Sequence, residues 1–215
     1  MPRASNPVIS PRKKPRQLRS TQLVDDILEA AVRVLLRDGG ARFTTVTVAR
    51  EAGVSVGSLY QYFPNKAALL FRLQADEWLE TWGGIEAILD DETRTPRERL
   101  SRAVFAFFRS ERQEAALRAA LDAVGAQFRD APEAHALGGR VTRKIRAFVD
   151  AAVPTVPRDA RIAAADVIRT SMAAVAETIT TRGRSLADVD ACARASADMY
   201  FSYLEALEAR SASRG

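Results

Sequence analysis

The sequence predicts an all-α protein of about nine helices. Three observations support this prediction. Apolar residues recur at steps of three and four after residue 20, no segment alternates in the manner of a β-strand, and helix-starting or helix-stopping residues separate the periodic stretches. The chain has 215 residues, of which 47% are hydrophobic and 27% are charged, a balance typical of a protein that buries a core.

Start and stop signals place the helices along the chain. The first predicted helix begins near residue 20 and ends at Asp38-Gly39-Gly40, where glycines favour a stop. Thr95-Pro96-Arg97-Glu98 combines an N-cap, a proline at the first helical position and a glutamate that completes a capping box. A long helix is predicted from about Asp159 to Thr181, and Ser185 with Asp188 forms a second capping box that starts the last helix.

The excess positive charge lies in the N-terminal segment. Residues 1–20 hold six of the 32 basic residues and none of the 27 acids, so the rest of the chain carries a net charge of −1. Four prolines interrupt this segment, which predicts a disordered basic arm over residues 1–19. Such an arm either adds phosphate or minor-groove contacts or only keeps the chain soluble, and composition does not decide between these two roles.

Composition also limits the cellular location. No apolar run approaches the roughly 18 residues of a membrane-spanning helix, and no apolar segment follows the basic N-terminus as in a secretion signal. Cys192 is the only cysteine, so no disulfide can form within the chain, and this residue is expected to pack as a small apolar group. We therefore expect a cytoplasmic protein without a membrane partner.

The segment from Thr44 to Lys66 has the anatomy of a helix-turn-helix. Thr44 or Thr45 caps a short first helix, and Gly53 suits the left-handed conformation of a sharp turn. Ser55 then caps a second helix whose first turn carries little side-chain bulk, so its backbone can approach base edges in a DNA groove. We expect contacts with double-stranded DNA from these residues: Thr44, Thr45, Ser55, Val56, Gly57, Ser58, Tyr60, Gln61, Tyr62 and Lys66.

The expected contacts fall into two chemical kinds. Gln61 can form a bidentate pair with adenine, and Val56 can pack on a thymine methyl group. Tyr60 or Tyr62 can donate a hydroxyl hydrogen to phosphate, and Lys66 begins the next helix, where the free N–H groups also attract an anion.

The same residues resemble the tetracycline-repressor (TetR) family of bacterial regulators. The resemblance covers about residues 20–75 and departs from the family at Ala67-Ala68, where acidic residues are usual. It is carried by Thr44-Thr45, Ala49, Ala52-Gly53-Val54-Ser55, Gly57-Ser58-Leu59-Tyr60, Tyr62-Phe63, Lys66 and Leu69-Leu70. The resemblance implies a homodimer that represses transcription from a near-palindromic operator and is released by a small-molecule effector. It implies a helix-turn-helix domain over residues 20–66 and a ligand-binding and dimerisation domain over 67–215.

Two apolar stripes near the C-terminus are expected to form the dimer. Met172 belongs to the first and Met199 to the second, and many alanines beside them allow helices to approach closely. Pairing the last two helices of two copies about a two-fold axis would bury both stripes. The stripes are Ile162, Ala165, Met172, Val175 and Ile179, then Val189, Cys192, Met199, Tyr203 and Leu207.

A second set of large residues is a candidate lining for an effector cavity, with ordinary core packing as the alternative. Trp78 and Trp82 share one face of the helix that Lys66 begins, so this helix would link a cavity to the DNA. The set is Trp78, Trp82, Phe105, Phe108, Phe128 and Met172.

Two features of the sequence are also compatible with functions other than DNA regulation. Gly53-Val54-Ser55-Val56-Gly57 fits the nucleophile elbow of α/β-hydrolases, and His135 lies downstream, but the elbow follows a buried strand and here a charged helix precedes it. A helical interaction protein that binds DNA without sequence preference through residues 1–19 is the second alternative. No phosphate-binding loop, dinucleotide fingerprint or Cys/His cluster is present, so we expect no enzyme activity, no cofactor and no metal site.

Overall fold

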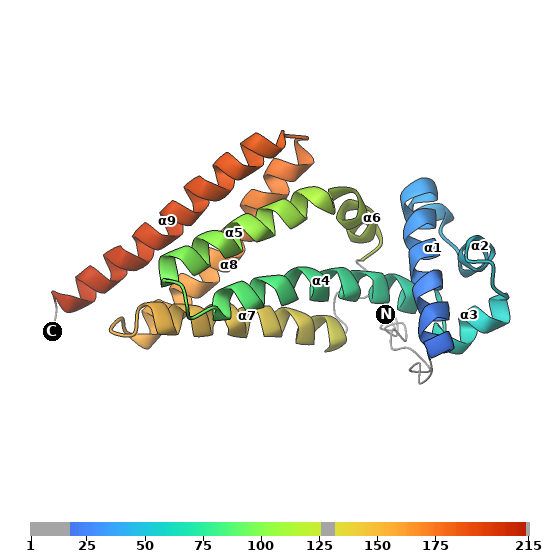
Figure 1. Cartoon of the computed structure of the whole chain (residues 1–215), viewed down its shortest axis with the longest axis horizontal. Coiled ribbons are helices and arrows are strands. Elements are labelled where there is room, and N and C mark those ends of the chain that lie inside the picture. Colours follow the sequence, from blue (N-terminus) through green and yellow to red (C-terminus); the bar gives the residue numbers. More distant parts are fainter. Residues whose placement is uncertain (1–17, 126–131, 214–215) are drawn as a thin grey trace, which may run out of the picture. The chain divides into compact units, whose positions relative to one another are not determined.

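The computed structural model describes residues 18–125 and 132–213 and confirms the all-α prediction (Figure 1). All but the last two residues of the expected basic arm lie outside these ranges. Within them the chain forms nine helices and no strand: α1 Leu18–Arg42, α2 Thr45–Glu51, α3 Val56–Tyr62, α4 Lys66–Asp90, α5 Pro96–Gln113, α6 Ala115–Gly125, α7 Pro132–Ala152, α8 Arg158–Thr181 and α9 Leu186–Ala212.

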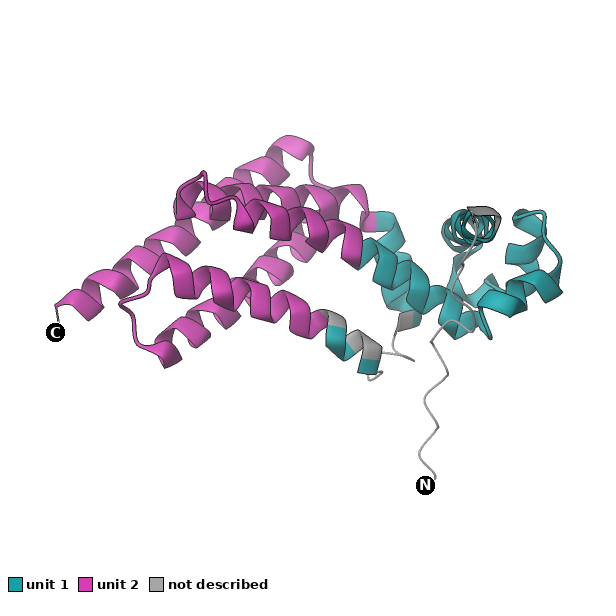
Figure 2. Ribbon diagram, turned by 60° about the horizontal axis from the view of Figure 1, so that its bottom comes forward, with its two compact units in different colours: residues 1–78, 116–136 teal, residues 79–115, 137–215 magenta. Residues whose placement is uncertain are grey.

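The helices group into two compact units, which Figure 2 colours separately. The first unit combines residues 1–78 with 116–136, and the second combines residues 79–115 with 137–215. The unit that holds the helix-turn-helix segment thus extends beyond Lys66 into α4. It also takes in nearly all of α6, a helix that is distant in sequence.

The first unit is built on the apolar stripe of α1. Ile27, Val34 and Leu35 are fully buried and share one core with Phe43 and with residues of α2, α3 and α4. Leu121 of α6 belongs to the same core and is 1% exposed. α6 therefore completes the core of the unit that contains α2 and α3.

The second unit is built around α5, which packs along α9 and α8 (Figure 1). Its core includes Val104 and Phe108 of α5, with apolar residues of α7, α8 and α9 around them. Tyr200 of α9 is 2% exposed and accepts a hydrogen bond from the Ser171 hydroxyl of α8 over 3.2 Å. Burial raises the pKa of Tyr200 above its ordinary value, so the phenol stays neutral in this core.

Local signals in the sequence define several helix ends as predicted. The carboxylate of Glu98 accepts the Thr95 backbone N–H at 2.9 Å, and Ser185 with Asp188 forms the same reciprocal box at the start of α9. Gly39 interrupts α1 with a φ of 72°, a left-handed conformation that glycine adopts without strain. α4 starts firmly despite the two alanines at its first turn, because the Asn65 side chain accepts the Ala68 N–H at 2.8 Å.

The prediction that two apolar stripes face a dimer partner is wrong for most of their residues. Ala165, Met172 and Ile179 of α8 and Val189 of α9 are buried in the core of their own subunit, whereas Met199 is 54% exposed. The physical reason is that α5 packs against both helices and takes up these faces. Across the described ranges, no helix is long and apolar enough to cross a membrane.

Candidate DNA-binding interface

Two capped helices and a glycine turn form the predicted helix-turn-helix. The Thr44 hydroxyl accepts the Thr47 backbone N–H at 3.0 Å, and the Thr47 side chain bonds back to the Thr44 backbone, which fixes the start of α2. Gly53 turns the chain with a φ of 68°, as the sequence predicted. The Ser55 hydroxyl then accepts the Ser58 N–H at 3.0 Å and caps α3.

Buried apolar residues hold α2 against α3. Val48 and Leu59 are fully buried and Ala49 is 1% exposed, so the small side chain at residue 49 lies at a close helix contact. This packing and the two caps give the motif a defined geometry. The hydrolase alternative receives no support here, because helix α2 precedes Ser55 and the Ser55 hydroxyl serves as a cap.

The outer face of α3 consists of small and polar groups. Gly57 and Gln61 are exposed, Val56 and Ser58 are partly exposed, and the Ser58 hydroxyl lies 2.8 Å from that of Ser55. A β-carbon added to Gly57 would meet only the Ser55 hydroxyl oxygen, at an ordinary 3.7 Å. Nothing inside the unit therefore requires glycine at residue 57.

The structure separates the two tyrosines named as phosphate contacts. Tyr60 is 39% exposed, and its hydroxyl lies 3.0 Å from the Thr45 hydroxyl at the start of α2. Tyr62 is 6% exposed and packs in the core of the first unit, and Thr45 is itself 7% exposed. Tyr60 is thus the accessible tyrosine, and Thr45 orients it from α2.

Lys66 has an internal partner that the sequence did not indicate. Its Nζ donates to the Gly40 carbonyl oxygen at 2.6 Å and lies 5.6 Å from the centre of the Phe43 ring. An ammonium carries three N–H groups, so this bond leaves two for other acceptors. Lys66 therefore ties the start of α4 to the end of α1 and keeps donors for an anion.

Acidic residues neutralise two of the arginines on the first unit. Arg37 bonds Glu51 through Nη1 at 2.8 Å and Asp38 through Nε at 3.0 Å, and Arg33 also reaches Glu51, at 3.2 Å. The hydrogen bonds from Arg37 and then Arg33 lower the pKa of Glu51 below its ordinary value of 4.5.

Two further arginines, which the sequence prediction did not name, flank or belong to helix α2. Arg42 and Arg50 are exposed, and neither forms an ion pair with any residue in the described ranges. Their positions in the sequence could have indicated them. Arg42 lies two residues before Thr44, the N-cap of α2, and Arg50 lies in the last turn of α2.

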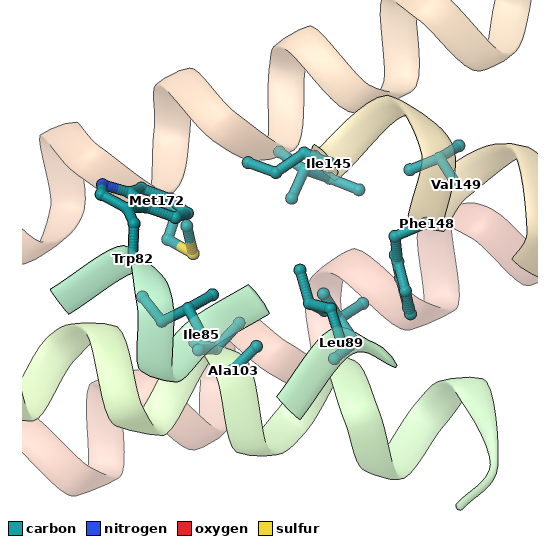
Figure 3. Close-up of a pocket in the computed structure, with 11 residues that line it drawn as sticks. Trp82, Ile85, Leu89, Ala103, Ile145, Phe148, Val149 and Met172 are labelled. Carbon is teal, nitrogen blue, oxygen red and sulfur yellow. The ribbon is translucent and has the colours of Figure 1, made fainter. Parts of the chain in front are cut away.

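The second unit encloses an apolar cavity (Figure 3). It contains about 370 Å³ of space, part of which is open to solvent. Trp82 and Met172 lie at one end in the figure, and Leu89 and Phe148 lie at the other. The lining residues are Trp82, Ile85, Leu89, Leu100, Ala103, Val104, Ile145, Phe148, Val149, Ile168 and Met172.

Only part of the predicted cavity set lies on this wall. Trp82 and Met172 do, whereas Phe108 lies in the core and Phe105 packs 5.6 Å from the Arg194 guanidinium. Trp78 is 37% exposed. Phe128 lies outside the described residues. The aliphatic lining was missed because periodicity gives each helix an inward face but does not distinguish a cavity wall from close packing.

One cation borders the cavity. Arg99 of α5 donates through Nη1 to the Leu89 carbonyl oxygen at 3.0 Å, and its guanidinium lies 5.6 Å from the centre of the Phe148 ring. Leu89 and Phe148 both line the cavity. Among the described residues no carboxylate forms an ion pair with Arg99, so a positive charge without an acidic partner lies beside one end of an apolar space.

Comparison with known proteins agrees with this geometry. A family described as bacterial regulatory proteins, tetR family, matches residues 27–73, and one described as tetracyclin repressor-like, C-terminal domain, matches residues 95–207, more than half of the chain. The chain belongs to the TetR family. It is a transcriptional regulator of that family, whose members bind DNA, dimerise and are typically not enzymes.

Solved structures of this family share the fold at low sequence identity. A TetR-like regulator from Rhodococcus sp. RHA1 aligns with a TM-score of 0.66 and 20% identity over 90% of this chain and 99% of that one. FadR from Bacillus subtilis, solved in complex with stearoyl-CoA, aligns with a TM-score of 0.58 and 19% identity over 82% of this chain and 97% of that one. These likenesses establish the TetR fold of the chain.

Curated relatives match a shorter stretch. The nucleoid occlusion factor SlmA of Aliivibrio fischeri is 36% identical over 89 residues, which are 40% of this chain and 41% of that protein. SlmA of Vibrio campbellii is 38% identical over 80 residues, or 36% of this chain and 40% of that protein. The chain thus spans about two fifths of the length of these relatives.

Proposed function

We propose that this TetR-family protein is a repressor that binds a near-palindromic operator in the bacterial cytoplasm and leaves it when a small molecule binds. The main support for DNA binding is the outer face of α3. Gly57, Gln61 and Tyr60 are exposed there, on a helix that a cap and a glycine turn hold in place. A helix presented in this way can lie in a major groove with its first turn near base edges.

Side chains divide into those that read bases and those that hold phosphates. Ser55, Val56, Ser58 and Gln61 are assigned to base edges, with Gly57 providing close approach of the backbone. The phosphate contacts are assigned to Thr44, Tyr60 and Lys66, with Arg42 and Arg50 as additional cations. Thr45 acts by orienting Tyr60, and Tyr62 acts in the core.

Selection of bound DNA from a random pool tests this assignment. We expect two half-sites related by a two-fold axis and spaced by about one turn of duplex, roughly 34–36 Å, or somewhat more. A chain lacking residues 1–19 should keep the same sequence preference. If that truncated chain lost all binding, or if the selected pool showed no preferred sequence, a DNA-binding arm would be the better explanation.

The proposed dimer uses the outer faces of α8 and α9. Val167 is 55% exposed and Met199 is 54% exposed, and small residues surround each of them. α8 and α9 contact each other, so the two faces can form one surface for a four-helix bundle with a second copy (Figure 1). The exposed residues are Ala163, Val167, Thr170 and Ala174 on α8, and Ala191, Ala195, Met199 and Ser202 on α9.

The proposed effector is a small apolar molecule that carries one acidic group. Apolar side chains line the cavity, and Arg99 places a positive charge near its Leu89–Phe148 end. Burying a carboxylate next to an unpaired cation is far less costly than burying it among apolar groups alone.

Release from DNA would follow from linkage. Trp82, Ile85 and Leu89 on the cavity wall belong to α4, the helix that begins at Lys66. An effector that prefers a position of α4 unfavourable for DNA binding lowers the affinity for the operator. The operator must then lower the affinity for the effector by the same factor.

Titration of the operator complex with decanoate and with decanol tests the effector class. Decanoate should release the labelled operator at a lower concentration than decanol, and Arg99→Met should remove that difference. Ala103→Leu, which fills part of the cavity, should abolish release by both while the operator still binds. Equal release by the acid and the alcohol from the wild-type protein would show that Arg99 does not select an acid.

A further inference from the structure

Helix α6 contacts the first unit at the end of α1, where a side chain at residue 40 would not fit. A β-carbon added to Gly40 would overlap Cγ1 of Val124 on α6. A β-carbon added to the nearby Gly39 or to Gly53 would meet nothing within 4 Å, although each of these residues has a positive φ. Gly40 is therefore distinguished by close packing against α6.

Two other contacts hold α6 in this place. Leu121 is 1% exposed in the core of the first unit, and Leu117 and Val124 pack beside the same core. Arg118 of α6 and Glu77 of α4 form a largely buried ion pair, with Nε of Arg118 donating to Oε1 at 2.7 Å and side-chain exposures of 14% and 7%. Buried pairs of this kind require accurate geometry, so α6 has a defined position on the unit.

Gly40 also contacts Lys66. Its carbonyl oxygen accepts the Lys66 Nζ at 2.6 Å, and the ammonium lies over the Phe43 ring. Residue 40 thus touches Val124 on one side and, through its carbonyl, the lysine at the start of α4. Any displacement of this peptide group moves the acceptor that holds the Lys66 ammonium.

We propose that Val124 is a positioning residue for DNA binding, because its contact with Gly40 fixes the carbonyl that orients Lys66. This inference rests on the proposed phosphate contact of Lys66. It adds that the contact depends on a residue more than 50 positions away in sequence, on a helix that carries none of the residues assigned to DNA.

A double-mutant cycle on operator binding tests the proposal. Gly40→Ala should displace the peptide group and weaken operator binding by about tenfold, the scale of one charge-assisted hydrogen bond. Gly40→Ala combined with Val124→Ala should recover most of the affinity, because the overlapping methyl group is gone. In a Lys66→Met background, Gly40→Ala should have no further effect. Gly138→Ala is the matched control, since a β-carbon there meets nothing within 4 Å.

The outcomes separate this proposal from the proposed function. If Lys66→Met alone leaves operator affinity and its salt dependence unchanged, the phosphate contact is refuted, and the positioning role is refuted with it. If Lys66→Met weakens binding but Gly40→Ala weakens it equally in both backgrounds, only the positioning role is refuted. If Gly40→Ala does not fold, Val124→Ala alone replaces it in the cycle. A loss of operator affinity only in the protein that retains Lys66 supports the positioning role. No loss, or an equal loss in the Lys66→Met protein, overturns it.

Discussion

Replacing Gly57 by alanine should separate the stability of the protein from its affinity for DNA. The added methyl group meets only the Ser55 hydroxyl oxygen at 3.7 Å, and residue 57 lies in the first turn of α3 without a positive φ. Alanine restricts the unfolded chain more than glycine does, so the free energy of unfolding should rise by about 0.4–1 kcal/mol. On the DNA side, the methyl group would enter a close contact between the α3 backbone and base edges. An extra methyl in a well-packed contact costs roughly 1–3 kcal/mol, or about five- to 150-fold in Kd.

Thermal unfolding and operator titration on the same samples measure both effects. Gly138→Ala on α7 makes the same chemical change in open space and should stabilise the protein without changing operator affinity. Gly53→Ala should instead destabilise it by roughly 1–2 kcal/mol, because a φ of 68° strains any side chain. Unchanged operator affinity in Gly57→Ala would refute the docking of the first turn of α3 on DNA, and a lower unfolding temperature would refute the claim that the fold accepts a methyl group there.

Four further outcomes are expected. Gln61→Ala should relax preference at one position of each half-site by roughly 1–3 kcal/mol, measured by repeating the selection with the variant. Tyr60→Phe should weaken binding to operator and random DNA by similar factors, and equal affinity to wild type in both titrations would remove Tyr60 from the phosphate contacts. Met199→Asp should give folded monomers by sedimentation, whereas Met172→Asp, at 5% exposure, should unfold the protein; a dimeric Met199→Asp would exclude the proposed interface. The pKa of Glu51 is lowered chiefly by Arg37 and then by Arg33, so its carboxylate stabilises the fold above pH 4.5 and loses that effect as pH falls through the folded pKa. In Glu51→Gln, the free energy of unfolding should therefore depend less on pH below 4.5.

Local signals in the sequence were sufficient to place the helix-turn-helix. The caps at Thr44 and Ser55 and the turn at Gly53 each depend on residues within three or four positions of one another. Such interactions form from neighbouring residues whatever the rest of the fold does, so they can be predicted without knowledge of tertiary packing. The capping boxes that start α5 and α9 were predicted for the same reason.

Contacts between distant helices could not be predicted in this way. Periodicity gave α6 an apolar face, but not that Leu121 would complete the core of the first unit. It gave α8 and α9 one stripe each, but the larger apolar residues face α5, and the outer faces are made of alanines with single exposed residues such as Val167 and Met199. On α8, Ala164 and Ala165 are buried whereas Ala163 and Ala174 are exposed, so hydropathy alone did not reveal which face remains free.

If α3 reads DNA as proposed, its buried and exposed residues would let it vary in DNA preference without losing its fold. Leu59 and Tyr62 are buried and hold the helix on the unit, and the Ser55 hydroxyl is engaged as its cap. Gly57 and Gln61 make no such contact with the core, so substitutions there change what the helix presents to DNA and leave the packing intact. Ser58 is intermediate, because its backbone N–H is held by Ser55 and its hydroxyl lies 2.8 Å from the capping oxygen. A change at Ser58 should therefore affect the helix start together with the proposed base recognition, whereas a change at Gln61 should affect the proposed recognition alone.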